Sequence, residues 1–356
     1  MSKAFESIRI CRWDLPQRFV MAPLTRNRAG EGQTPTELNA TYYGQRAGAG
    51  LIITEGTQPS AVGQGYLDTP GLHSDEQVAG WRLVADAAHA GGGRVVVQLM
   101  HAGRIAHPDN KNGLESVAPS AIAAPGQIVT PSGQQDFVTP RALETDEIPS
   151  LVAEFVHSAR QAVAAGLDGV EIHTANGYLP HQFLAPSSNQ RSDAYGGSPE
   201  NRARLTVEIT TAVAEAIGAD RVGIRISPSH NIQGVLEQDE AETAATYEAL
   251  VQGIAPLGLA YLSILGDPES DLVRHLRKRF EGPVILNTGF GSVTQLADVE
   301  DLLERDLGDL VAVGREFLAN PDLARRWREG AALNEPDQAT FYGGGAVGYT
   351  DYPTLD

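Results

Sequence analysis

The sequence predicts a (β/α)₈ barrel, with all 356 residues in a single domain. Three observations lead to this prediction. Eight short aliphatic runs recur along the chain, helical patterns lie between several of them, and 42% of the residues are hydrophobic, enough for a large buried core. The runs lack polar alternation, which is typical of parallel strands buried on both faces. A doubly wound open sheet is the alternative arrangement of the same pattern.

The predicted strands are residues 19–22, 51–54, 95–99, 169–173, 222–226, 260–265, 284–287 and 310–313. Between them, apolar residues recur at helical spacing in residues 148–163, 205–217 and 247–254. Gly166 stands where a helix C-terminal cap belongs. The tetrapeptide Ser292-Val293-Thr294-Gln295 has the pattern of a capping box and predicts another helix that begins there.

Two segments interrupt this alternation. Residues 1–18 precede the first strand, and we expect them to form a hairpin that closes the bottom of the barrel. Residues 102–144 follow the third strand and are rich in Pro, Gly and Ser. We expect this insertion to cap the C-terminal face of the barrel, where barrel enzymes have their sites.

The composition excludes several classes of function. A formal net charge of −18 is unfavourable for binding phosphate backbones, so we expect no nucleic-acid partner. One cysteine, Cys11, is too few for a disulfide framework, a zinc cluster or an iron–sulfur cluster within one chain. The first twenty residues lack the apolar core of a signal peptide, and no apolar run approaches a membrane span. We expect a cytoplasmic protein without membrane contact, either a monomer or a homodimer.

The most informative stretch for function is residues 173–178, His-Thr-Ala-Asn-Gly-Tyr, directly after the fourth strand. His173 and Asn176 can donate hydrogen bonds to one developing oxyanion, and Tyr178 can donate a proton. This combination suits the reduction of a double bond conjugated to a carbonyl. A histidine at a strand end is often a satisfied core residue, and a lone tyrosine is often a packing aromatic. The occurrence of all three together favours a functional role.

Polar residues at other strand ends extend this set with Thr25, Gln98 and Arg225. A buried amide or guanidinium needs a partner. A heterocycle with imide edges would satisfy Gln98, and an anion or an electron-rich ring would satisfy Arg225, although a structural carboxylate partner for Arg225 stays open. Thr25 is the weakest single candidate, because a lone threonine is usually just a strand residue. The set contains no metal-ligand cluster and no carboxylate pair, so we expect no metal site and no glycosidase chemistry.

The last two strands predict a phosphate site. Gly289 follows the seventh strand and precedes the helix expected at Ser292, and Gly314 and Arg315 follow the eighth strand. Glycines let backbone N–H groups approach a phosphate, a helix N-terminus adds positive potential, and Arg315 supplies charge-assisted hydrogen bonds. The alternative interpretation is that the glycines only form tight turns.

From about Phe5 to Leu355, the chain resembles the Old Yellow Enzyme family of FMN-dependent ene-reductases. The resemblance rests on ordered motifs at residues 21–26 (Met-Ala-Pro-Leu-Thr-Arg), 54–57, 97–99, 173–179, 189–198, 200–202, 314–321 and 348–353. It implies a tightly bound FMN over the top of the barrel, NADPH or NADH as hydride donor, and a small activated alkene as the second substrate.

The family's site residues carry over by position. The residues implied to contact the flavin ring are Pro23, Leu24, Thr25, Gly56, Gln98 and Arg225, and those implied to hold the phosphate are Gly289, Gly314 and Arg315. Thr25 would bond the C4 carbonyl edge, and Arg225 would stabilise negative charge near N1. The residues implied to contact the substrate are His173, Asn176, Tyr178, Tyr66, Met100 and Tyr342. The implied reaction is ping-pong, with hydride delivered to the β-carbon and a proton from Tyr178 delivered to the α-carbon.

Two other functions stay open. An α-hydroxy-acid oxidase would need a strong base, typically histidine with a paired carboxylate, where Asn176 and Tyr178 stand. A flavin-binding sensor without turnover would not need an intact set of His173, Asn176 and Tyr178. Within the family, Thr25 separates the chain from a branch with cysteine at that position. Met100 replaces a bulky aromatic of several relatives, so we expect altered substrate orientation there.

Overall fold

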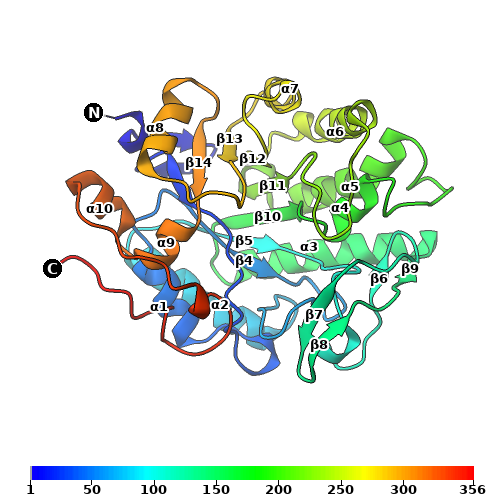
Figure 1. Ribbon diagram of the computed structural model, residues 1–356, viewed down its shortest axis with the longest axis horizontal. Coiled ribbons are helices and arrows are strands. Elements are labelled where there is room, and N and C mark those ends of the chain that lie inside the picture. The colour runs from blue at the N-terminus through cyan, green and yellow to red at the C-terminus, as the bar shows by residue number, and fades with distance from the viewer. Residues whose placement is uncertain (1) are drawn as a thin grey trace.

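The computed structural model describes residues 2–356, and its centre is a closed barrel of eight parallel strands (Figure 1). In order around the barrel, the strands are β10 (Gly169–Thr174), β11 (Val222–Ile226), β12 (Tyr261–Leu265), β13 (Val284–Asn287), β14 (Leu310–Val313), β3 (Phe19–Met21), β4 (Ile52–Thr57) and β5 (Val95–Leu99). β3 pairs with both β14 and β4, and β5 pairs with β10, so the sheet has no open edge. This closure confirms the predicted barrel and all eight strands, and it excludes the doubly wound open sheet.

Helices cover the outside of the barrel (Figure 1). They are α1 (Glu37–Gln45), α2 (Asp75–Ala90), α3 (Ile148–Ala164), α4 (Leu179–Leu184), α5 (Pro199–Ile217), α6 (Glu240–Ile254), α7 (Asp271–Phe280), α8 (Leu296–Glu304), α9 (Arg315–Ala319) and α10 (Leu323–Glu329). The three apolar patterns lie on α3, α5 and α6, which confirms those helices. Gly166 follows α3 with φ of 90°, as a cap glycine requires. Among helices of residues 2–356, none is long and apolar enough to cross a membrane.

The helix expected at Ser292 begins later in the chain. α8 starts at Leu296 after Gln295, and the Asp298 carboxylate accepts the Gln295 backbone N–H at 2.8 Å. The Gln295 side chain donates to Glu316 Oε1 at 2.6 Å, so it is engaged with α9 and does not close a capping box with Ser292. The prediction of a helix start at Ser292 is therefore wrong, and residues 288–295 form a loop.

The N-terminal segment forms the expected hairpin. β1 (Ile8–Ile10) and β2 (Trp13–Leu15) pair antiparallel, and Trp13 packs in one apolar cluster with side chains of the barrel strands. A Cβ on Gly169, the first residue of β10, would lie 3.0 Å from the Trp13 ring. The hairpin therefore closes the barrel at the N-terminal ends of its strands.

The insertion after the third barrel strand contains four short strands: β6 (Val117–Ala118), β7 (Gln127–Thr130), β8 (Gly133–Asp136) and β9 (Arg141–Ala142). β7 and β8 form an antiparallel hairpin. Ile128 and Val129 of β7 line the same cavity as Thr25 and Tyr178, which follow barrel strands at their C-terminal ends. The insertion thus borders the C-terminal face, as expected.

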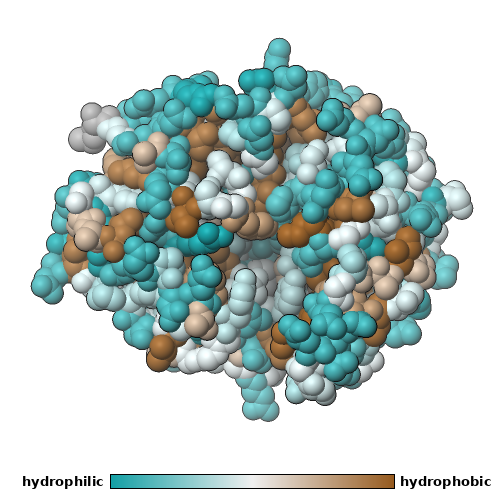
Figure 2. All heavy atoms as spheres, in the orientation of Figure 1, coloured by the Kyte–Doolittle hydropathy of each residue, from teal (hydrophilic) through white to brown (hydrophobic). Residues whose placement is uncertain are grey.

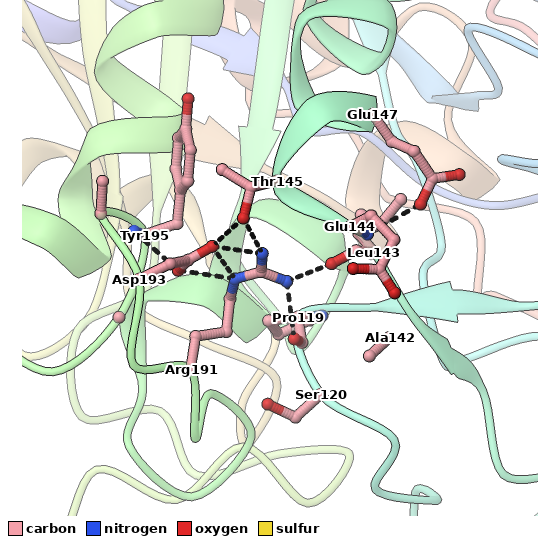
Figure 3. A network of polar contacts seen from close by, with 12 residues as sticks. Pro119, Ser120, Ala142, Leu143, Glu144, Thr145, Glu147, Arg191, Asp193 and Tyr195 are labelled. Atoms are coloured by element: carbon pink, nitrogen blue, oxygen red, sulfur yellow. Dashed lines mark hydrogen bonds and ion pairs between the residues drawn. The ribbon is translucent and has the colours of Figure 1, made fainter.

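Arg191 ties this insertion to the barrel (Figure 3). Its guanidinium donates to the carbonyl of Pro119 at 3.1 Å and to that of Leu143, on the two sides of the β7–β8 hairpin. Its Nε also donates to Asp193 Oδ1 at 3.0 Å, and the Thr145 hydroxyl donates to the same carboxylate. The pKa of Asp193 lies below its usual range, mainly because its carboxylate accepts hydrogen bonds from Arg191. One guanidinium therefore joins both stems of the insertion to the segment after α4.

Candidate active site

A cavity at the C-terminal ends of the strands brings together most of the predicted site residues. Its volume of about 330 Å³ suits a small organic ligand. The face drawn in Figure 2 is hollowed near its centre. The predicted residues that line the cavity are Pro23, Leu24, Thr25, Gly56, Gln98, Met100, His173, Asn176, Tyr178, Arg225, Arg315 and Tyr342. Phe290, Leu318 and Phe341 complete the lining; as ordinary apolar residues they carry no sequence signal.

Three predicted residues lie beside this cavity. Tyr66 lines an adjoining cavity of about 650 Å³, which shares Thr25, Tyr178 and Tyr342 with the first. Gly289 lines a separate cavity. A Cβ on Gly314 would lie 3.5 Å from Leu24 Cδ2, so Gly314 lies next to Leu24 of the cavity lining.

His173 reaches the cavity from the end of β10. It is in register with Arg225 on β11, and its Nδ1 has no hydrogen-bond partner among residues 2–356. Burial lowers the pKa of His173 well below its usual value, and the positive charge of Arg225 and the nearby His181 lower it further. His173 is therefore a neutral imidazole, with one nitrogen that donates and one that accepts a hydrogen bond.

The next residues turn sharply, which brings Asn176 close to His173. Asn176 and Gly177 have φ values of 56° and 83°, in the left-handed region that asparagine and glycine tolerate best. Ser227 Oγ accepts the Asn176 N–H and His181 Nδ1 accepts the Gly177 N–H, both at 2.9 Å. Within residues 2–356, Asn176 Oδ1 has no partner. The backbone of the turn is thus fixed, while the Asn176 side chain stays available to a ligand.

Tyr178 completes the polar wall of the cavity. Its ring centroid lies 5.0 Å from that of His173, and its hydroxyl lies 3.0 Å from the Tyr66 hydroxyl. Burial raises the pKa of Tyr178, and the nearby Tyr66 and Gln233 side chains offset only part of that effect. Tyr178 therefore carries its proton at neutral pH and is available as a proton donor.

Gln98 and Arg225 line the cavity, and Glu171 is the hydrogen-bond partner of Gln98. Gln98 Nε2 donates to Glu171 Oε1 at 2.7 Å, which leaves Gln98 Oε1 to accept a hydrogen bond from a ligand. No carboxylate lies within 4.0 Å of the Arg225 guanidinium in the described chain, so it lacks a direct ion pair. Burial lowers the pKa of Arg225, and the negative charge of Glu171 offsets part of that effect. Arg225 Nε has no hydrogen-bond partner among the same residues. Sequence reasoning missed Glu171, although an acidic residue inside a buried strand is a usable signal.

Arg315 supplies a second guanidinium to the cavity lining. Its Nη2 donates to the carbonyl of Phe290 at 2.6 Å, so it lies against the glycine-containing loop after β13. A Cβ on Gly289 or Gly291 would meet nothing within 4 Å, which leaves room for a ligand beside this loop. Because α8 begins beyond this loop, the helix dipole expected at Ser292 does not contribute, and Arg315 with backbone N–H groups is left to bind an anion.

These features define a class of protein: a barrel enzyme with a site for a heterocycle that carries an anionic tail. Residues 3–334 match the NADH:flavin oxidoreductase / NADH oxidase family. A Leishmania infantum protein described as a probable flavin mononucleotide-dependent alkene reductase is 40% identical over 96% of this chain and 94% of its own length.

Two solved structures are also similar. Morphinone reductase in complex with tetrahydroNAD has a TM-score of 0.93 and 44% identity over 100% of this chain and 98% of its own. The old yellow enzyme homologue from Zymomonas mobilis has a TM-score of 0.93 and 38% identity over 99% and 100% of the two chains. The chain belongs to the NADH:flavin oxidoreductase / NADH oxidase family, within its Old Yellow Enzyme homologues. It is accordingly an FMN-dependent oxidoreductase with a nicotinamide hydride donor.

Proposed function

We propose that the protein is an ene-reductase that reduces the activated C=C bond of α,β-unsaturated carbonyl or nitro compounds with NADPH or NADH in a ping-pong reaction. The observation that carries this proposal is the convergence of His173, Asn176 and Tyr178 on one wall of the cavity. A structural role would not require all three, and two of them have polar atoms without a partner in residues 2–356.

His173 and Asn176 bind the substrate oxygen in this proposal. A neutral imidazole and a side-chain amide each donate one hydrogen bond, and together they stabilise the negative charge that develops on a carbonyl or nitro oxygen. Burial holds the pKa of His173 low, and the positive charge of Arg225 lowers it further. The imidazole therefore acts as a hydrogen-bond donor rather than as an acid. This polarisation makes the β-carbon electrophilic.

Tyr178 acts as the general acid. Its proton goes to the α-carbon, on the side of the alkene that faces the cavity wall, and the raised pKa of the phenol keeps that proton in place until the substrate is bound. FMN, when bound, would supply the hydride chemistry that links oxidation of the nicotinamide to reduction of the β-carbon. One cavity that serves both substrates in turn requires the oxidised nicotinamide to leave before the alkene enters.

The residues proposed to hold FMN divide into two groups. Gln98 Oε1 would accept from an imide N–H of the ring, Arg225 would stabilise its electron-rich edge, and Thr25 would bond a ring carbonyl. Gly289, Gly314 and Arg315 would hold the phosphate, as the open space beside the glycine loop and the guanidinium at Phe290 favour. Pro23, Leu24 and Gly56 supply the remaining wall against the ring.

The substrate side is proposed to extend into the adjoining cavity. Tyr66 and Tyr342 line that cavity, and Met100 lines the wall of the first. We propose small activated alkenes as substrates and a cytoplasmic location, in keeping with the single cysteine of the chain.

An anaerobic spectral titration tests this function. The purified protein is titrated first with NADPH or NADH and then with 2-cyclohexenone. We expect the flavin absorbance to bleach with the nicotinamide and to return with the enone. A flavin that stays oxidised with both nicotinamides would favour a binding protein without turnover. A flavin that bleaches and is not restored by enones, maleimides or nitroalkenes would contradict the alkene specificity.

A further inference from the structure

The loop after β11 carries a side chain that joins two parts of the proposed catalytic machinery. Gln233 Nε2 donates to the backbone carbonyl of Asn176 at 2.7 Å. Gln233 Oε1 lies 3.5 Å from the Tyr66 hydroxyl, which lies 3.0 Å from the Tyr178 hydroxyl. Gln233 therefore contacts the turn that carries the oxyanion-binding amide and, through Tyr66, the proton donor. No motif in the sequence marks this residue.

The backbone at Gln233 is held in an unfavourable conformation. Val235 N–H donates to the Ile232 carbonyl at 3.0 Å, and the two residues between them, Gln233 and Gly234, have φ values of 57° and 72°. These are the left-handed values of a type I′ turn, in which glycine, asparagine or aspartate is preferred to glutamine. Strain that persists beside an active site indicates a functional constraint.

The hydrogen bond to Asn176 decides which end of the Gln233 amide faces the two phenols. Only the amide nitrogen can donate to a carbonyl, so Nε2 points to Asn176 and Oε1 points to Tyr66. Burial raises the pKa of both Tyr66 and Tyr178, so both phenols keep their protons at neutral pH. Two adjacent hydroxyl groups need an external acceptor to set the direction of their hydrogen bonds, and Gln233 Oε1 is placed to be that acceptor.

We propose that Gln233 is a positioning residue for proton delivery, an inference that rests on the ene-reductase function proposed above. It orders the Tyr66–Tyr178 hydroxyl pair and holds the turn at Asn176, so that the Tyr178 hydroxyl reaches the α-carbon. When the substrate binds, the Tyr178 hydroxyl turns from Tyr66 to the alkene. Its O–H bond breaks, a C–H bond forms at the α-carbon, and the electron pair stays on the Tyr178 oxygen. The Tyr66 hydroxyl then turns from Gln233 Oε1 and donates its proton to that oxygen. Solvent restores the proton of Tyr66 through the adjoining cavity, which all three side chains line.

Two variants of Gln233 test this role. Gln233→Asn suits the left-handed turn but is too short to reach Tyr66, and Gln233→Met keeps the length but forms no hydrogen bond. Gln134→Met, at an exposed position of β8, is the matched control. Each holoenzyme is reduced anaerobically with dithionite and mixed either with 2-cyclohexenone or with ferricyanide. Ferricyanide takes electrons only, so it reports on the flavin without protonation of carbon.

We expect both Gln233 variants to slow reoxidation by the enone about tenfold, a fraction of what a general acid contributes, and to leave reoxidation by ferricyanide unchanged. In a Tyr66→Phe background the same substitutions should cost less than in the wild type, because only the contact with Asn176 is then left to lose. An unchanged enone rate, an equal loss with ferricyanide, or an undiminished loss in the Tyr66→Phe background would each overturn the inference.

Tyr178→Phe, measured alongside, separates this inference from the function on which it rests. If Tyr178→Phe keeps the wild-type enone rate, the acid proposed for the reaction is wrong, and the role of Gln233 is overturned with it. If Tyr178→Phe slows the enone step while the Gln233 variants do not, only the inference about Gln233 fails.

Discussion

Replacing Tyr178 with phenylalanine should separate the two half-reactions of the enzyme. The substitution removes one hydroxyl and keeps the ring, which is only 8% exposed and packs against His173 and Tyr66. The lost hydrogen bond to Tyr66 costs about 1 kcal/mol of stability, which a folded domain tolerates. The cavity wall therefore stays in place, and only the proton donor is lost.

The magnitude follows from the role of the proton. A positioned general acid contributes roughly 10²–10⁴ in rate, or about 2.7–5.4 kcal/mol at 1.36 kcal/mol for each factor of ten. Hydride transfer from the nicotinamide to FMN needs no proton from Tyr178. We therefore expect reduction of 2-cyclohexenone to slow at least about a hundredfold in Tyr178→Phe, while flavin reduction by NADPH or NADH changes less than about threefold.

Anaerobic stopped-flow absorbance of the flavin measures each half-reaction by itself. Tyr195→Phe is the matched control, because Tyr195 hydrogen-bonds to Glu208 outside the cavity. Both half-reactions of this control should keep their wild-type rates. Equal losses in the two half-reactions of Tyr178→Phe would refute the reasoning, since they would indicate a damaged flavin site. An enone rate close to wild type would also refute it, since the proton would then come from elsewhere.

Three further predictions concern charge. Burial raises the pKa of Glu55 from 4.5 to about 7, so the stability that its bound proton contributes is present below pH 4.5 and is lost as the pH rises through about 7. Glu55→Gln should therefore make the denaturant midpoint of unfolding vary less with pH over that range. A midpoint that varies with pH as in the wild type would contradict this. Arg315→Ala should weaken FMN binding about tenfold or more in fluorescence titrations. The binding of riboflavin, which lacks the phosphate, should stay unchanged. Equal losses of affinity for both ligands would exclude a phosphate contact. Arg191→Ala should speed hydrogen exchange in residues 116–145 and spare the barrel strands, whereas unchanged exchange would show that other contacts hold the insertion.

The alternation of aliphatic strand patterns and helical patterns in the sequence was enough to predict the barrel fold. The barrel strands are buried on both faces because one face packs into the barrel and the other against helices, and this leaves mainly aliphatic runs in the sequence. The grouping of His173, Asn176 and Tyr178 could also be predicted from the sequence. All three follow one strand end, so the chain itself keeps them close in space.

Only the tertiary structure decided the contacts between distant segments. The bond from Gln233 to Asn176 joins residues 57 positions apart, and that from Gln98 to Glu171 joins residues 73 positions apart. A distant contact also decided where α8 begins. Gln295 donates to Glu316, 21 positions away, and does not form the expected local cap with Ser292. Periodicity and capping patterns report the interactions of a residue with its near neighbours in the chain. Which polar partner a side chain finds across the barrel depends on closure of the sheet, and closure brings together loops that no local pattern relates.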